Sequence, residues 1–154
     1  MDRTSRVFSR LFYMSPKKIL VVDDDAVILR TLLTKLQGKG YEVVTVSDGS
    51  EAVTAVRRFK PDLILLDVTL PVNVGMDWNA FSIMEWLKHV PEAKGTPVII
   101  ISGGDPKKIM DKVVAAGATA FFQKPINHEE LDKLIRRTLG IEDKVTPAAF
   151  TLKT

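Results

Sequence analysis

The sequence contains no cysteine and only two histidines among its 154 residues. Without cysteine the chain cannot form disulfides or thiolate metal sites, and the scarcity of histidine argues against zinc and copper centres. It also has no apolar run approaching the roughly 18 residues that a membrane-spanning helix needs. The length allows one domain with a real hydrophobic core. We therefore expect a cytoplasmic protein of one domain without a membrane span, since the absence of cysteine is compatible with a reducing compartment.

The chain also lacks a strong overall charge, because its formal net charge is only +3. Residues 1–18 hold five basic side chains and one acidic one, a net charge of +4, whereas residues 19–140 hold 15 basic and 16 acidic side chains, giving −1. The excess basicity is thus confined to the N-terminal segment. By composition the body of the protein is not a nucleic-acid-binding surface.

Residues 1–16 are interpreted as a basic tail with little structure. Alternatively, the tail is a short amphipathic segment that contacts a membrane or a partner protein. This interpretation is based on its arginines, which alternate with apolar residues near helical spacing. The arginines are Arg3, Arg6 and Arg10, and the apolar residues are Val7, Phe8, Leu11 and Phe12.

After the tail, five apolar runs alternate with stretches of helical period. The runs are residues 19–22, 41–46, 63–66, 98–101 and 119–122. This alternation predicts an α/β fold, a doubly wound five-stranded parallel sheet with helices on both faces. The second run alternates apolar and polar residues, which favours an edge strand. The first, third and fourth runs are almost uniformly apolar, as central strands should be.

Several helix boundaries can be predicted from single residues. The helix after the first strand carries Leu29, Leu32, Leu33 and Leu36 on one face and stops at Gly38 or Gly40. The third helix carries Phe81, Met84, Leu87 and Val90. The fourth opens at Asp105 and Pro106 and closes at Gly117, and the fifth opens with Asn127 and Glu130 in a capping-box relation.

Polar side chains gather where the apolar strands end. Asp23 and Asp24 follow the first strand, Asp67 the third, Ser102 the fourth and Lys124 the fifth. Each has an ordinary explanation as a turn, cap or solvated residue, and Asp25 is explained as a helix cap. Because parallel strands place their carboxyl ends at one edge of the sheet, we expect all five side chains to meet there.

Carboxylates clustered in this way suit a magnesium ion, which prefers oxygen ligands. A carboxylate can also attack phosphorus and form an aspartyl phosphate. The incoming phosphoryl group then needs its charge neutralised by a cation and by hydrogen-bond donors, which an ammonium and a hydroxyl provide.

With these motifs the sequence resembles the receiver domains of two-component response regulators. The matching segments are VVDDD, SDGSEAV, LILLDVTLP, IIISGG and GATAFFQKP, within residues 17–140. The resemblance implies a flavodoxin-like fold with strand order 2-1-3-4-5. It also implies a receiver domain over residues 17–140 and a short C-terminal tail over residues 141–154.

The resemblance further implies a role for each acidic residue of the cluster. Asp67 would be the phosphoacceptor, and Asp24 and Asp67 would bind Mg²⁺ directly. Asp23 would hold the ion through water, and the backbone carbonyl of Thr69 would complete the protein ligands.

Three further residues take roles from the family. Ser102 would bond a phosphoryl oxygen on activation, and Lys124 would pair with the phosphoryl group. Phe121 would change rotamer with the state of Ser102. The Lys124–Pro125 peptide bond occupies the family's cis-proline position.

The sequence departs from the family pattern beside the site. The segment PVNVGMDWNAF over residues 71–81 is longer than usual and has Trp78 where glycine is common. Residues 89–95 add length, and Gly103 stands where the family mostly has alanine. These changes bear on loop geometry, and so on partner choice and the rate of dephosphorylation.

The expected function is a single-domain response regulator, not an enzyme in its own right. It would take a phosphoryl group from a histidine kinase or histidine phosphotransfer protein. It would then signal to a partner protein through the fourth helix, fifth strand and fifth helix.

The alternatives are an aspartyl-phosphate phosphohydrolase and a phosphorelay intermediate or phosphate sink. The haloacid-dehalogenase signature is absent, because Val68 and Thr69 follow Asp67 where that class needs a second acid. A flavin or nucleotide carrier would need a phosphate-binding loop in place of the first carboxylates.

Overall fold

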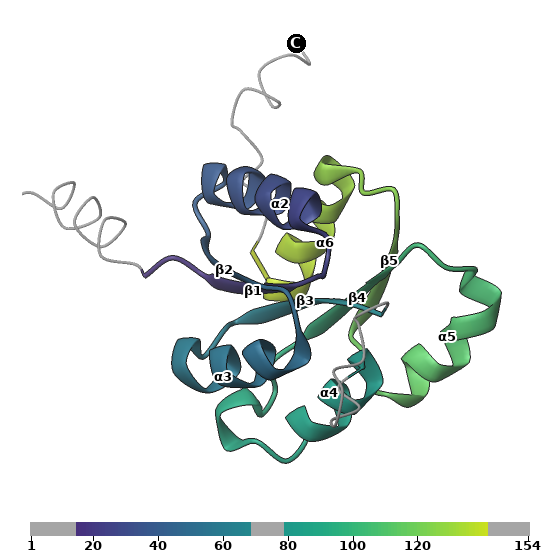
Figure 1. Cartoon of the computed structure of the whole chain (residues 1–154). Coiled ribbons are helices and arrows are strands. Elements are labelled where there is room, and N and C mark those ends of the chain that lie inside the picture. The colour runs from purple at the N-terminus through teal and green to yellow at the C-terminus, as the bar shows by residue number, and fades with distance from the viewer. Residues whose placement is uncertain (1–14, 69–78, 142–154) are drawn as a thin grey trace, which may run out of the picture.

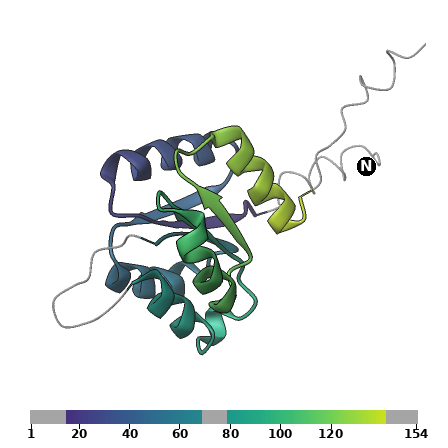
Figure 2. The same ribbon diagram turned by 90° about the vertical axis from the view of Figure 1, so that its right-hand side faces the viewer.

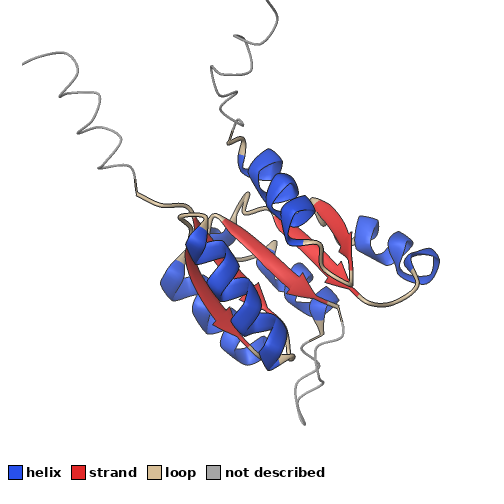
Figure 3. Ribbon diagram, turned by 90° about the horizontal axis from the view of Figure 1, so that it is seen from above, coloured by secondary structure: helices blue, strands red, loops and turns tan. Residues whose placement is uncertain are grey.

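One parallel sheet forms the centre of the protein (Figures 1 and 3). The computed structural model describes residues 15–68 and 79–141. The strand order is β2-β1-β3-β4-β5, and every neighbouring pair is parallel, which confirms the predicted fold class and order. The strands are β1 (Lys18–Val22), β2 (Glu42–Val46), β3 (Leu63–Asp67), β4 (Val98–Ser102) and β5 (Ala120–Gln123).

In the described part of the chain, five α-helices cover both faces of the sheet (Figures 1 and 2). The α2 and α6 helices lie on one face and the α3, α4 and α5 helices on the other. Their bounds are α2 (Ala26–Gly38), α3 (Gly49–Phe59), α4 (Ala80–Leu87), α5 (Pro106–Ala115) and α6 (His128–Leu139), with a short 3₁₀ helix, η1 (Pro91–Ala93), after α4. Among the described residues, no helix is long and apolar enough to cross a membrane.

The alternation of side chains along each strand divides the core into two layers. In β1, Ile19 and Val21 pack under α2 and α6, whereas Leu20 and Val22 pack under α3, α4 and α5. The β3 and β4 strands alternate in the same way, so both of their faces are buried. This explains why their sequences are continuously apolar, as central strands of a parallel sheet require. The β2 strand lies at the edge, as its mixed pattern predicted.

Side-chain caps fix the helix starts that the sequence indicated. The Asp25 carboxylate accepts hydrogen bonds from the backbone of Val27 and Ile28 and begins α2. Asp105 and Asn127 cap α5 and α6 in the same way. After α2 it is Gly40, at φ 93°, that takes the left-handed conformation, since Gly38 is still helical.

One predicted helix is shorter than expected. The α4 helix ends at Leu87, so Val90 lies outside it, although its side chain is buried. Val90 is extended, at φ −99° and ψ 116°, and precedes Pro91, the first residue of η1. Proline disfavours a helical conformation in the residue before it, which explains why the apolar pattern continues where the helix does not.

Candidate functional site

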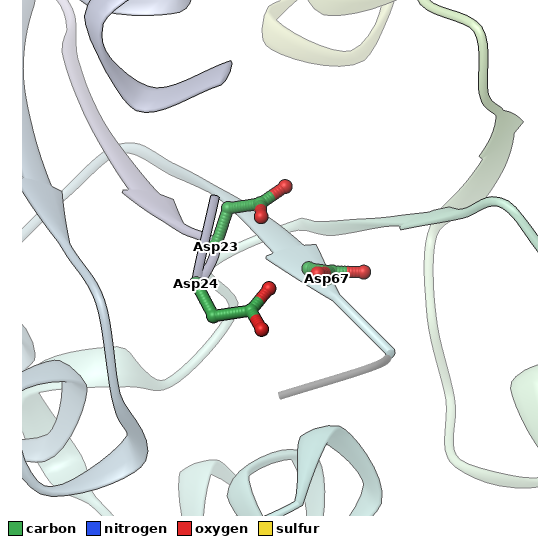
Figure 4. Close-up of side chains that lie close together, drawn as sticks. All are labelled: Asp23, Asp24 and Asp67. Carbon is green, nitrogen blue, oxygen red and sulfur yellow. The ribbon is translucent and has the colours of Figure 1, made fainter. Parts of the chain in front are cut away.

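Three carboxylates meet at the carboxyl ends of β1 and β3 (Figure 4). Asp67 is the last residue of β3, and Asp23 follows the last residue of β1. Val22 of β1 pairs with Leu66 of β3. The residues that follow them, Asp23 and Asp67, therefore lie at the same level of the sheet. Asp23 and Asp67 are buried and Asp24 is exposed, yet one carboxylate oxygen from each lies within 4.8 Å of the others.

The Lys124 side chain reaches this cluster from the end of β5. Its Nζ atom lies 3.0 Å from Asp23 Oδ2 and 3.5 Å from Asp67 Oδ2. The other oxygen of Asp23 accepts a hydrogen bond of 2.9 Å from the backbone N–H of Asp25. An ammonium group thus offsets the repulsion between two buried carboxylates, and both oxygens of Asp23 are held in place.

The pKa values of this pair reflect burial and mutual attraction. Burial raises the pKa of Asp23, and the charge of Asp67 adds to this, although the hydrogen bonds from Asp25 and Lys124 oppose the shift. Burial alone would lower the pKa of Lys124, but the hydrogen bond to Asp23 and the charge of Asp67 outweigh it and raise that pKa. Lys124 is therefore a permanent cation of the site at neutral pH.

Ser102 ends β4, one residue after Ile101, the partner of Asp67 in the sheet, and it is buried, with an exposed fraction of 1%. Its Oγ accepts a 3.0 Å hydrogen bond from the backbone N–H of Gly104, and its carbonyl accepts one of 2.8 Å from the backbone N–H of Lys124. The loop after β4 is therefore tied to the residue that carries the ammonium group.

Phe121 lies on β5 opposite Ile100 of β4. Both pack in the layer under α3, α4 and α5, and alternation puts Ser102 on the same face as Ile100. The aromatic ring thus shares a sheet face with the hydroxyl and takes no part in the acidic cluster.

Two predictions from the resemblance concern the backbone. The Lys124–Pro125 peptide bond is cis, as predicted. The carbonyl of Thr69 and most of the lengthened loop over residues 71–80 lie outside the described residues.

The donor set fits magnesium. Three carboxylates supply hard oxygen atoms close enough to share one ion, and Asp24 is exposed, so that waters can complete the coordination. The described residues bring no histidine into this cluster, and the chain has no cysteine.

Sequence reasoning missed the polar contacts that organise the cluster. The sequence analysis identified Asp25 only as a helix cap, but the backbone N–H of Asp25 also orients Asp23.

The sequence analysis also missed a cavity of about 260 Å³ beside Lys124, between the start of α2 and residues 125–128. Its wall includes Val27, which is 71% exposed. An apolar residue at the first turn of a helix, beside the acidic motif, was the only available signal.

Comparison with known proteins agrees with this arrangement. The family model of the response regulator receiver domain matches residues 19–136. The polar-differentiation response regulator DivK of Brucella anthropi is 29% identical over 125 residues, which cover 81% of this chain and 98% of DivK. The DNA-binding response regulator MtrA of Mycobacterium tuberculosis is 33% identical over 127 residues, 82% of this chain. The matched region spans only 52% of MtrA, about half its length.

Solved structures show the same likeness. The chemotaxis response regulator CheY4 of Vibrio cholerae has a TM-score of 0.72 and 32% identity, covering 80% of this chain and 99% of that one. The receiver domain of the sensor histidine kinase PA1611 of Pseudomonas aeruginosa has a TM-score of 0.72 and 26% identity, covering 82% and 99%. That structure holds a magnesium ion coordinated in its active site cleft.

Proposed function

The chain belongs to the response regulator receiver domain family, and from this we propose that it accepts a phosphoryl group on Asp67 from a phosphohistidine donor. The observation that carries the proposal is the placement of Asp67. Its carboxylate is buried at the end of β3, within 3.5 Å of the Lys124 ammonium and beside Asp23 and Asp24.

In the proposed reaction an oxygen of Asp67 attacks the phosphorus atom of the donor. The new oxygen–phosphorus bond gives an acyl phosphate, and the nitrogen–phosphorus bond breaks with its electron pair remaining on the imidazole. Lys124 already stands beside Asp67, so its charge is in place to stabilise the oxygens of the transferring group.

The residues that would hold Mg²⁺ are Asp23, Asp24 and Asp67, with the Thr69 carbonyl by resemblance. When bound, the ion supplies positive charge that neutralises phosphoryl oxygens. The protein's own contribution is to fix these carboxylates. The hydrogen bond from the Asp25 backbone does this for Asp23, and the register of β1 and β3 does it for Asp67.

The proposed output is a conformational change passed through β5. Ser102 Oγ turns from Gly104 toward a phosphoryl oxygen, and Phe121, on the same sheet face, responds to the movement of the loop. The surface formed by α5, β5 and α6 then presents a changed face to a downstream protein. Exposed apolar side chains on α5, Met110 at 36% and Val114 at 70%, support a protein-binding role for that surface.

The function is tested by incubation with a small acyl-phosphate donor, with and without Mg²⁺, followed by intact mass. We expect one added phosphoryl group, dependent on Mg²⁺ and removed by hydroxylamine. The Asp67→Asn variant should gain none. The matched control is Asp62→Asn, at the opposite end of β3, which should be labelled like the parent. Equal labelling of Asp67→Asn and the parent would remove the assignment of the phosphoacceptor.

A further inference from the structure

Two consecutive glycines, Gly103 and Gly104, follow Ser102 in the loop after β4. The left-handed conformation that favours glycine occurs elsewhere in the described chain, with φ between 68° and 93°, at Gly40, Gly95, Gly117 and Gly140. Gly103 and Gly104 lie outside that region, so the backbone at these two positions does not exclude a side chain. The reason for glycine there has to be sought in the surrounding atoms.

A side chain at position 103 would touch the stem of Lys124. A Cβ atom at this position would lie 3.9 Å from both Cβ and Cδ of Lys124, the nearest described atoms beyond the chain neighbours of Gly103. These distances are ordinary van der Waals contacts, so alanine fits without displacing the lysine. A larger side chain would add atoms against the stem. At position 104 a Cβ atom would instead face the hydroxyl of Ser102, 3.4 Å from its Oγ.

The stem of Lys124 is also loosely packed on the side of α2. There it lines the cavity of about 260 Å³ between the start of α2 and residues 125–128. The two ends of the residue are held, since its backbone N–H donates to the Ser102 carbonyl at 2.8 Å and its ammonium pairs with Asp23 and Asp67. Between these two anchors the stem has room to change its rotamer.

The proposed phosphorylation of Asp67 calls for such a movement. In the structure the Lys124 ammonium lies closer to Asp23, at 3.0 Å, than to Asp67, at 3.5 Å. A phosphoryl group on Asp67 would place its oxygen atoms beyond the carboxylate, on the far side of the new oxygen–phosphorus bond. The ammonium has to follow them to reach a charge-assisted contact of about 2.8 Å, and the stem moves with it.

We propose that Gly103 is a positioning residue for phosphoryl transfer. The space that its missing side chain leaves, together with the cavity beside α2, lets the stem of Lys124 carry the ammonium from Asp23 to the phosphoryl group. Gly103 itself does not contact the reacting atoms and acts through Lys124. This inference rests on the proposed phosphorylation of Asp67.

The test compares rates of phosphorylation by acetyl phosphate and Mg²⁺, followed by intact mass. Gly103→Ala should react at nearly the parental rate, because its Cβ makes only ordinary contacts. Gly103→Val should react about two- to tenfold more slowly, the range expected when one side chain is held away from its preferred rotamer. The matched control is Gly38→Val in the last turn of α2, where a Cβ atom meets no described atom within 4 Å, and it should react like the parent.

Two further measurements separate positioning of Lys124 from damage to the fold. The rise in melting temperature with Mg²⁺ should persist in Gly103→Val, because the three carboxylates stay in place, whereas a disrupted loop would lose it together with the rate. In a Lys124→Ala background, which lacks the stem beyond Cβ, Gly103→Val should cause no further slowing. Gly103→Leu, which is not branched at Cβ, gives the same comparison if valine prevents folding.

Three outcomes would each overturn the proposal: a parental rate in Gly103→Val and Gly103→Leu, equal slowing in Gly38→Val, or an undiminished effect of Gly103→Val in the Lys124→Ala background. A parent that takes no phosphoryl group, or an Asp67→Asn variant that takes one, would instead contradict the proposed function. The two failures are therefore distinguishable.

Discussion

Lys124 is the residue on which the electrostatics of the site depend. Its ammonium lies between two buried carboxylates, 3.0 Å from Asp23 and 3.5 Å from Asp67. It would therefore attract a phosphoryl group on Asp67 but repel a second cation in the same cluster. We therefore expect this side chain to promote phosphoryl transfer and to weaken Mg²⁺ binding.

Replacing Lys124 with methionine separates the two effects. Without the ammonium, Mg²⁺ should bind more tightly, on the order of tenfold for a unit charge about 5 Å from a divalent ion in a largely hydrated site. Phosphorylation by an acyl-phosphate donor should nevertheless become slower. Isothermal titration with Mg²⁺ and rates from intact mass measure the two quantities, with Lys107→Met as a control. Weaker Mg²⁺ binding in Lys124→Met would contradict this account of the lysine.

Tyr41 and Asp132 form a second buried polar pair, far from the site. The tyrosine hydroxyl donates to Asp132 Oδ1 at 3.3 Å and joins the start of β2 to α6. Burial, together with the charge of Asp132, raises the pKa of Tyr41 from 10.0 to about 12. The folded state therefore favours the neutral form of the Tyr41 hydroxyl. The resulting stabilisation is fully present below the pKa of Tyr41 in the unfolded chain, and it is lost as pH rises through the pKa in the folded protein.

The prediction is that the free energy of unfolding of the parent falls between pH 10 and about 12, and falls less in Tyr41→Phe. Urea unfolding at several alkaline pH values measures it. Tyr13→Phe, in the N-terminal segment, is the control for the other tyrosine of the chain. Parallel pH profiles for the parent and Tyr41→Phe would show that folding does not raise the pKa of Tyr41.

At the level of elements, the sequence predicted most of what positions the site. Continuous apolar runs predicted β3 and β4, and capping residues such as Asp25 and Asn127 predicted the helix starts. Apolar runs and caps can be identified in the sequence because they are local properties of the chain. The prediction that Val90 belongs to the third helix was wrong, because Val90 is apolar and buried without being helical. The contact of Lys124 with Asp23 could not be predicted from spacing, since the residues are 101 positions apart and meet only through the strand order.

The α5 helix and β5 strand are suited to respond to the site. Within α5 only Val113 is buried, and every residue of β5 remains at least partly exposed. Elements that bury little apolar surface move at low cost in free energy.

Under the switch hypothesis, Phe121→Ala still accepts phosphate on Asp67 but loses the phosphorylation-dependent change in partner affinity. Ser102→Ala behaves likewise, with slower phosphorylation, because it lacks the hydroxyl donor. Binding of the phosphorylated and unphosphorylated protein to an identified downstream partner measures the change. Full phosphorylation-dependent binding in both variants would show that coupling does not pass through β5, while the phosphoacceptor assignment would stand.

For the whole molecule, a magnesium ion bound at the acidic cluster would make stability depend on magnesium. A ligand that binds only the folded state stabilises it by mass action, by about 2.7 kcal/mol at a concentration 100 times its Kd. Mg²⁺ should therefore raise the melting temperature of the parent. Asp24→Ala should reduce this rise, because it removes one ligand, whereas Asp105→Asn, at the cap of α5, should not. An equal rise in Asp24→Ala and the parent would place the metal elsewhere.

The central claim is that Asp67 carries the phosphoryl group, and borohydride reduction tests it most directly. Reduction of an acyl phosphate converts the aspartate to homoserine, which tandem mass spectrometry of the digested protein locates. After treatment with Mg²⁺ and an acyl-phosphate donor, we predict homoserine at residue 67 alone, and none when the donor is omitted. Homoserine at Asp23 or Asp24, or none at residue 67 in protein that intact mass shows to be phosphorylated, would contradict the account.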